Sequence, residues 1–196
     1  MRLITLSENT AGKPGLKAEW GLSILVEAED ATILFDTGAE NAVVQNADEL
    51  NVDFRSLSAV VLSHGHADHV GGLKSVLTRT KGIDVFCHPS IWESKYTKRP
   101  YEDHYAYIGM PHQQKLLEHY GASFHIHKEP QQLRRNIWIS GEIPMITDFE
   151  VIEPIFYVQS GEKFIPDFLE DDQSLIIQTN RGLVIVLGCS HRGLIN

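Results

Sequence analysis

The sequence predicts an α/β domain whose chemistry lies at the carboxyl ends of parallel strands. The first observation is an apolar run at residues 57–62, followed by a helical repeat at residues 70–80 and a second apolar run at residues 83–87. Together these predict a parallel βαβ unit. The second observation is a hairpin, in which the β-branched runs 174–179 and 183–187 flank a short turn. The third is the length, because 196 residues can bury one good core, so we expect a single domain over residues 1–196.

The other elements follow in order from local patterns. Residues 1–6 predict a first strand. Residues 21–27 and 31–35 predict a hairpin, because both runs are apolar and Glu29 and Asp30 form a plausible turn between them. We then expect a helix at residues 41–50, a helix at 112–120, a strand at 122–127, and short strands at 137–140 and 149–152. The inner face of the first helix is expected to consist of Ala42, Val43, Ala47 and Leu50.

Residues 92–110 fit no core pattern. They carry Lys95, Lys98, Arg99 and His104 among four tyrosines. Tyrosine and basic side chains on one loop can form a lid that stacks on a ring and pairs with phosphate. The same composition suits an irregular, solvated connection, and the sequence leaves both possibilities open. As a lid, the segment would use Lys98 and Arg99 to bind an anionic substrate.

Most of the chemical information lies in residues 63–72, which read S-H-G-H-A-D-H-V-G-G. Histidine and carboxylate side chains suit zinc, iron or manganese. Residues two apart in an extended turn point the same way, so His64 and His66 can bind one ion, while Asp68 and His69 can face a second. In two-metal sites the ions lie roughly 3.5–4 Å apart. The cluster follows a predicted buried strand, which is where open α/β sheets place their sites, and this position favours metal binding over a chance group of surface histidines.

Two motifs together resemble a known superfamily. Residues 64–69, H-G-H-A-D-H, resemble the H-x-H-x-D-H signature of the metallo-β-lactamase superfamily, and residues 34–38, L-F-D-T-G, resemble its upstream strand. The resemblance implies a metallo-β-lactamase-like αββα sandwich with two divalent metal ions, zinc first and iron or manganese as alternatives. It also implies that Asp36 fixes the metal-binding loop without binding metal itself. Ligating histidines do need a carboxylate or carbonyl on their other ring nitrogen, although Asp36 alone reads as a turn residue ahead of Gly38.

A second candidate ligand turn lies at residues 187–193, L-G-C-S-H-R-G. His191 is expected to bind metal because, like His64, it follows the end of a strand. Cys189 is either a ligand or a buried core cysteine, which is the usual fate of a lone cysteine. In the superfamily this turn often carries an aspartate that bridges the metals or, in some β-lactamases, a cysteine, and Cys189 matches that position.

The chain departs from the superfamily pattern in two places. The T-P-G-H element that supplies a third histidine is missing, and Phe168 falls about where that histidine would lie, so His191 is expected to replace it. The chain also stops at Asn196, whereas related proteins continue through another helix and strand to a last histidine, often within G-G-F-H. We therefore expect a C-terminally truncated sandwich with an under-ligated second metal, unless a distant residue such as His88 supplies the ligand.

Further motifs narrow the resemblance to a subfamily. In chain order they are E-W-G-L-S at residues 19–23, G-E-I-P at 141–144, D-D-Q-S-L at 171–175 and G-C-S-H at 188–191. They resemble proteins related to 7,8-dihydropterin-6-methyl-4-(β-D-ribofuranosyl)aminobenzene-5'-phosphate synthase, over nearly the whole chain. The resemblance implies that G-E-I-P and D-D-Q lie near the pocket, so Glu142 is a candidate substrate-binding residue. The residues alone predict a surface turn at Glu142, and a solvated pair or a helix cap at Asp171 and Asp172.

Charge and cysteine usage limit the partners. A net charge of -9 disfavours a nucleic-acid interface, which needs a basic face. No run has the length of a membrane span and the first residues lack a signal pattern, so no membrane partner is expected. Cys87 and Cys189 are far apart and form no disulfide framework, which favours a cytoplasmic protein. The sequence gives no indication of the oligomeric state.

The leading functional hypothesis is a metal-dependent hydrolase acting on a phosphorylated or cyclic small molecule. Bound metal lowers the pKa of its water towards ~7 and so supplies hydroxide for attack on phosphorus or a carbonyl carbon. His64, His66 and His191 would hold the first ion. Asp68 and His69 would hold the second more weakly, and the resemblance implies that Asp68 also accepts the proton of the attacking water.

Two alternatives stay open. One is a synthase that condenses a pterin diphosphate with a ribosylaminobenzene phosphate, and the other is a catalytically silent metal- or ligand-binding module. Secreted β-lactamase activity is disfavoured because the signal peptide and the third-histidine element are missing.

Overall fold

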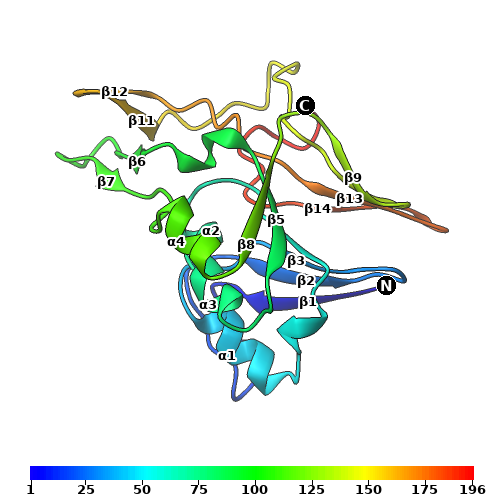
Figure 1. Ribbon diagram of the computed structural model, residues 1–196. Coiled ribbons are helices and arrows are strands. Elements are labelled where there is room, and N and C mark those ends of the chain that lie inside the picture. Colours follow the sequence, from blue (N-terminus) through cyan, green and yellow to red (C-terminus); the bar gives the residue numbers. More distant parts are fainter.

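The computed structural model describes residues 1–196, and its largest sheet has six strands in the order β1-β2-β3-β4-β5-β8 (Figure 1). These strands are β1 (Arg2–Ser7), β2 (Ser23–Glu27), β3 (Thr32–Phe35), β4 (Ala59–Val61), β5 (Ile83–Cys87) and β8 (Ala122–Ile126). The first three pair antiparallel, while β3, β4, β5 and β8 run parallel. The carboxyl ends of β3 and β4 therefore lie side by side, and the loops that leave them start from the same edge.

A second, antiparallel sheet packs against the six-stranded one. Its order is β14-β13-β10-β9, and its strands are β9 (Gln131–Arg134), β10 (Ile137–Ile139), β13 (Leu175–Thr179) and β14 (Gly182–Val186). The two sheets enclose a core of 11 buried residues. Val26, Ile33 and Phe35 come from one sheet, and Ile139 and Leu175 from the other, because alternate residues of a pleated strand face one side.

Short helices cover the other face of the six-stranded sheet, at the lower left of Figure 1. They are α1 (Ala42–Glu49), α2 (Ala67–Val70), α3 (Leu73–Leu77) and α4 (Gln114–His119), with short 3-10 helices at Phe54–Ser56 and Pro89–Trp92. A core of 20 buried residues joins these helices to the sheet. None of the helices is long and apolar enough to cross a membrane.

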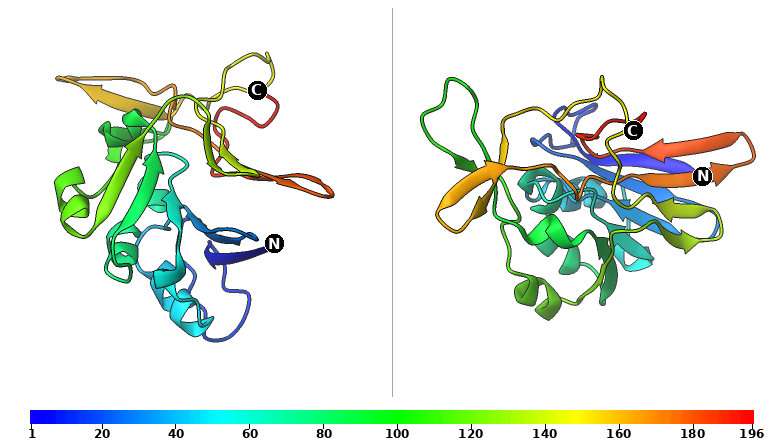
Figure 2. Two further views of the ribbon diagram at one scale, coloured as in Figure 1. Left: turned by 45° about the vertical axis from the view of Figure 1, so that its right-hand side comes forward. Right: turned by 90° about the horizontal axis from the view of Figure 1, so that it is seen from above.

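A third, smaller sheet projects to one side of the two large sheets (Figures 1 and 2). Its order is β12-β11-β6-β7. The strands are β6 (Lys95–Thr97), β7 (Ala106–Tyr107), β11 (Phe156–Ser160) and β12 (Lys163–Pro166). We call it the side sheet. It brings together two segments that are far apart in the sequence.

Most predicted elements are present within a few residues of their expected ends, including the β2–β3 hairpin, α1, β5, α4, β8 and the β13–β14 hairpin. The predicted helix at residues 70–80 is instead two short helices, which Gly71 and Gly72 separate. This junction requires glycine, because a Cβ atom at Gly71 would collide with the backbone carbonyl of Ala39 and one at Gly72 with that of Thr37.

One predicted strand is absent from the structure, and several observed strands were not predicted. Residues 149–152 form no strand, and Phe149 and Val151 are exposed. The four strands of the side sheet and β9 were not predicted, because their half-exposed residues do not give a clear alternation. Part of the segment expected to be a lid or an irregular connection thus forms β6 and β7.

Replacing Leu34 tests the assignment of the main core. Leu34 on β3 is fully buried, so Leu34→Ala is expected to lower the free energy of unfolding by about 2–5 kcal/mol, through lost burial and the cavity left behind. Urea denaturation measures this change. Leu183→Ala is the matched control, because Leu183 is 62% exposed and its loss is expected to change stability by less than about 0.5 kcal/mol. Equal losses in the two variants would contradict the assignment.

Candidate metal centre

The first ligand loop, residues 63–69, begins directly after β4 and runs into α2. His64 and His66 are buried, and Nε2 of His64 lies 3.1 Å from Nδ1 of His66. The loop therefore points two imidazole nitrogens at the same small volume, as the two-residue spacing predicts. Ser63 contributes as well, because its Oγ lies 2.8 Å from Nδ1 of His64 and fixes that ring.

Asp36 holds this loop from the end of β3. Its carboxylate accepts hydrogen bonds from the N–H and the Oγ of Ser63, both at 2.7 Å, and lies 2.7 Å from Nδ1 of His69. Asp36 is fully buried and has a φ of 58°, a left-handed conformation that non-glycine residues adopt at some energetic cost. The carboxylate thus fixes the start and the end of the first ligand loop at once, without joining the cluster of ligand atoms.

The second ligand loop, residues 188–192, follows β14 and lies against the first. The ring of His191 has its centroid 5.0 Å from that of His64 and 5.1 Å from that of His66. Sγ of Cys189 lies 3.1 Å from Nε2 of His69. The close approach requires glycine at position 188, because a Cβ atom there would collide with the side chain of Ser63.

The two loops form two overlapping groups of potential metal ligands. One consists of His64, His66 and His191, and the other of His64, His69 and Cys189; within each group all ligand atoms lie within 4.8 Å of one another. Nε2 of His66 and Nε2 of His191 are buried and have no hydrogen-bond partner. Buried, unpaired ring nitrogens beside converging imidazoles fit a bound divalent cation, since native proteins seldom leave such atoms unsatisfied.

Burial also sets the protonation of these rings. It is the main reason that the pKa values of His64 and His66 lie well below the usual histidine value, and it lowers the pKa of His191 to about 4. These three rings are neutral at neutral pH, which is the form that binds a metal. Burial is the largest single influence on His69 and acts to lower its pKa, but Asp36 and Cys189 together outweigh burial and raise that pKa well above the usual value.

Asp68 lies at the edge of the centre. Its Oδ2 is 3.6 Å from Nε2 of His69, and its side chain is 27% exposed. The backbone carbonyl of Asp68 accepts a hydrogen bond from the N–H of Leu22 at 3.1 Å. Gly21 precedes that contact, and only glycine fits there, because its φ is 145° and a Cβ would collide with the same carbonyl. The E-W-G-L-S motif thus contacts and stabilises the first ligand loop at the backbone carbonyl of Asp68.

The three candidate substrate-binding residues lie in other surroundings. The ammonium of Lys98 lies 5.0 Å from the ring centroid of Tyr105, and Arg99 donates to the hydroxyl of Tyr101 at 3.1 Å. The connection between β6 and β7 carries both and points away from the large sheets (Figure 1). Glu142 accepts hydrogen bonds from His88 at 2.9 Å and from Lys128 at 3.0 Å. His88 is thereby engaged and belongs to neither group of ligand atoms.

Several residues near the centre escaped the sequence analysis. Phe156 on β11 packs on the rings of His66 and His191, with centroid distances of 5.1 and 4.8 Å. Lys95, grouped with the lid lysines, is fully buried. The residues alone predicted a solvated pair or a helix cap at Asp171 and Asp172, and the solvated pair is wrong. Both are buried and contact the ligand loops, which agrees with the position near the pocket that the resemblance implied for D-D-Q. Apart from the D-D-Q motif itself, no local pattern marks these residues.

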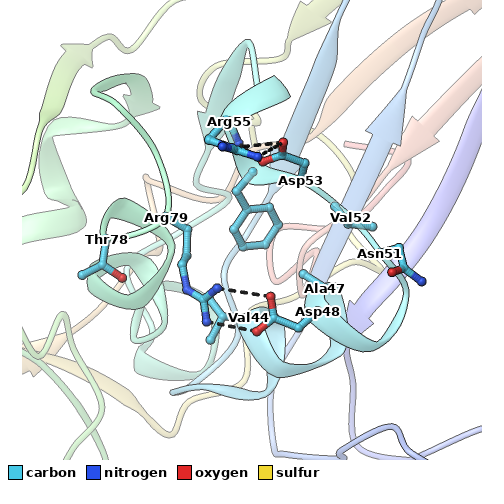
Figure 3. A pocket seen from close by; sticks show the side chains of 10 residues that line it. Val44, Ala47, Asp48, Asn51, Val52, Asp53, Arg55, Thr78 and Arg79 are labelled. Carbon is cyan, nitrogen blue, oxygen red and sulfur yellow. Dashed lines mark hydrogen bonds and ion pairs between the residues drawn. The ribbon is translucent and has the colours of Figure 1, made fainter.

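A hollow on another part of the surface offers no comparable chemistry. It lies between α1, α3 and the 3-10 helix Phe54–Ser56 (Figure 3). Its two arginines are already paired, Arg79 with Asp48 at 3.0 Å and Arg55 with Asp53 at 2.8 Å. None of the candidate metal ligands lines it. The ligand loops are therefore the better candidate site.

Comparison with known proteins assigns the family. The family model described as the metallo-beta-lactamase superfamily matches residues 21–189, which include Asp36, the first ligand loop and Cys189. The chain belongs to the metallo-beta-lactamase superfamily. This match confirms the resemblance drawn from two motifs, H-x-H-x-D-H and D-T-G. The mixed sheets and helices confirm the predicted fold class.

Two curated members and one solved structure are similar over most of this chain. The chain is 31% identical over 208 residues to the 7,8-dihydropterin-6-methyl-4-(beta-D-ribofuranosyl)-aminobenzene-5'-phosphate synthase of Methanocaldococcus jannaschii, covering 100% of this chain and 70% of the relative. It is 31% identical over 192 residues to an uncharacterized protein of the same organism, covering 97% of this chain and 70% of that protein. The structure of Tm1679, a metal-dependent hydrolase of the beta-lactamase superfamily, has 29% identity and a TM-score of 0.79, and the match covers 97% of this chain and 66% of that one. The chain spans only part of the length of each relative.

Replacing Asp36 tests its hold on the first ligand loop. Asp36→Asn keeps the size of the side chain and a residue type that tolerates a left-handed backbone. It removes the charge and one acceptor, so we expect Zn²⁺ to bind about 10–100-fold more weakly. Competition with a chromophoric chelator measures this affinity.

Asp84→Asn is the matched control, because Asp84 also pairs with a histidine, His125, at 2.9 Å, but on the exposed surface. Its Zn²⁺ affinity is expected to equal that of the unmodified chain. An unchanged affinity in Asp36→Asn would show that the loop does not depend on this carboxylate.

Proposed function

We propose that this chain is the metal-dependent catalytic unit of a hydrolase that acts on a phosphorylated or cyclic small molecule. The observation that supports this best is the convergence of His64, His66 and His191 from two loops, with an unpaired, buried Nε2 on both His66 and His191. The relative described as a metal-dependent hydrolase, with a TM-score of 0.79 and 29% identity, supports the same type of reaction.

In this proposal, His64, His66 and His191 hold one divalent ion, and Asp68, His69 and Cys189 hold a second. Zinc is the preferred ion because imidazole and thiolate ligands both suit it, with iron and manganese as alternatives. Such ions polarise a substrate oxygen and lower the pKa of bound water towards ~7. Because the pKa of His69 is raised, its ring would have to lose a proton before it could hold an ion.

In the same proposal, the surrounding residues exclude water, admit the substrate and accept a proton. Phe156 packs on His66 and His191 and keeps water away from that side of the centre. Cys189 is exposed and Asp68 partly so, which makes their side the route for the substrate. On that side, Oδ2 of Asp68 would accept a proton from the attacking water. Lys98, Arg99 and Glu142 remain candidate contacts to an anionic substrate.

A reducing compartment suits this centre. Cys189 binds metal only as a free thiolate, and neither Cys189 nor Cys87 forms a disulfide. The cytoplasm keeps cysteines in this form. We therefore place the protein in the cytoplasm.

Activity of the full chain tests the proposal. Loaded with Zn²⁺, it is expected to hydrolyse at least one member of a panel of phosphodiesters, lactones and thioesters. His66→Ala is expected to lower kcat/KM about 100-fold or more, because even residues that only support metal ligands typically contribute 10–100-fold. His125→Ala removes an exposed histidine that pairs with Asp84 and is expected to leave kcat/KM unchanged. Full metal loading without turnover of any substrate would contradict the hydrolase and favour a silent metal-binding module.

The second candidate is the synthase reaction, which the 31% identity over the whole chain favours. Here the metals would activate a diphosphate leaving group on a pterin, and a ribofuranosylaminobenzene phosphate would replace it. Diphosphate release that requires the acceptor would support this reaction. Release of phosphate or diphosphate without acceptor would support hydrolysis instead, and the same incubation measures both.

A further inference from the structure

Three consecutive residues, 171–173, contact both ligand loops. Oδ2 of Asp171 accepts a hydrogen bond from the N–H of Gly65, between the two metal-facing histidines, at 2.8 Å. Oδ2 of Asp172 accepts one from the N–H of Arg192, next to His191, also at 2.8 Å. Gln173 donates through its own N–H to the carbonyl of Ser63 at 3.0 Å and through Nε2 to the carbonyl of Leu62 at 2.9 Å. One short segment therefore sets the position of the first loop relative to the second.

A buried lysine holds the Asp171 end of this segment in place. Nζ of Lys95, which is fully buried, lies 3.0 Å from Oδ1 of Asp171 and 2.8 Å from Oδ2 of Asp167. A buried carboxylate is strongly destabilising unless it is paired, and Asp171 is both paired with Lys95 and bonded to Gly65. Lys95 lies on β6, so the interaction also ties the side sheet to the first ligand loop.

The Asp172 end acts on the other loop. Asp172 is 2% exposed. The side chain of Arg192 donates through Nε to the carbonyl of Phe168 at 3.0 Å. A carboxylate that accepts the backbone N–H of Arg192 fixes the peptide that directly follows His191. That peptide adjoins the Cα atom of His191, whose ring centroid lies 5.0 Å from that of His64 and 5.1 Å from that of His66.

We infer that Asp171 and Asp172 are positioning residues which set the distance between the two ligand loops, so that His64, His66 and His191 face a single ion. The inference rests on the metal centre of the proposed function. In this role the two carboxylates of the D-D-Q motif act through hydrogen bonds to the loops, and neither of them binds the ion. Lys95 holds the carboxylate of Asp171 in the orientation that bonds to Gly65.

A pair of variants separates this role from general stability. Asp171→Asn is expected to weaken Zn²⁺ binding about 10–100-fold and to alter the absorption spectrum of the Co²⁺-loaded chain, because one of the two oxygens that accept from Gly65 and Lys95 becomes an amide nitrogen, which cannot accept. Asp167→Asn is the matched control. Asp167 is also buried and bonded to Lys95, but its other hydrogen bond goes to the N–H of Leu169 and it touches neither ligand loop. Its Zn²⁺ affinity and Co²⁺ spectrum are expected to match those of the unmodified chain.

Asp172 provides a second test that leaves the Lys95 ion pairs intact and applies even if Asp171→Asn fails to fold. Asp172→Ala is expected to weaken Zn²⁺ binding to a similar extent. Asp172→Asn is expected to restore it, because its amide oxygen can accept the same N–H of Arg192. Loss of affinity in both variants, or in neither, would overturn the role of Asp172.

Hydrogen exchange gives a readout that does not depend on metal. In the metal-free chain, Asp171→Asn is expected to speed exchange of the Gly65 amide, whereas Asp167→Asn does not. Equal exchange in these two variants, or equal Zn²⁺ affinity, would overturn the positioning role and leave the metal centre standing. An unmodified chain that binds no Zn²⁺ would instead overturn the metal centre and the proposed function together.

Discussion

The Asp36 carboxylate is the interaction on which the rest of the site depends. It sits at the carboxyl end of β3, buried and in a left-handed conformation, and bonds to Ser63 and His69 across the neighbouring strand end. A buried charge is tolerated only when its hydrogen-bonding capacity is filled, and here the first ligand loop fills it. The parallel pairing of β3 and β4 makes this possible, because it brings the two strand ends together. The same bond that stabilises Asp36 therefore orients His69.

The remaining constraint is the meeting of two loops from distant parts of the chain. Cys189 and His69 are 120 positions apart, yet their ligand atoms lie at 3.1 Å. Gly188 allows the approach, and Asp171 and Asp172 hold one loop each. Buried imidazoles with lowered pKa values stay neutral, so no charge repulsion opposes the convergence of His64, His66 and His191. The convergence of these potential metal ligands thus results from ordinary backbone contacts that bring neutral rings together.

The local sequence predicted the parts of the site that lie close together in the chain. The first ligand loop and its position after β4 could be read from spacing and from the apolar run before it, and Asp36 from its motif. His191 was expected from its place after a strand, whereas Cys189 was left open as a ligand or a core cysteine and matched a superfamily ligand position. The structure brings both to the first loop.

Contacts over long sequence separations could not be predicted in the same way. Asp171 reads as a solvated residue because its partners, Lys95 and Gly65, lie 76 and 106 positions away. Lys95 reads as a surface lysine for the same reason. The side sheet was missed because its strands are short and half-exposed, so that pairing, rather than an apolar alternation, defines them.

Metal stoichiometry tests the central claim most directly. The chain is purified without chelator, dialysed against Zn²⁺, and analysed by elemental analysis beside His64→Ala/His66→Ala and His125→Ala variants. The account predicts two ions per chain in the unmodified protein and in His125→Ala, and at most one ion in the double variant, which removes two of the three ligands proposed for the first ion. Absence of metal from the unmodified chain, or full retention by the double variant, would contradict it.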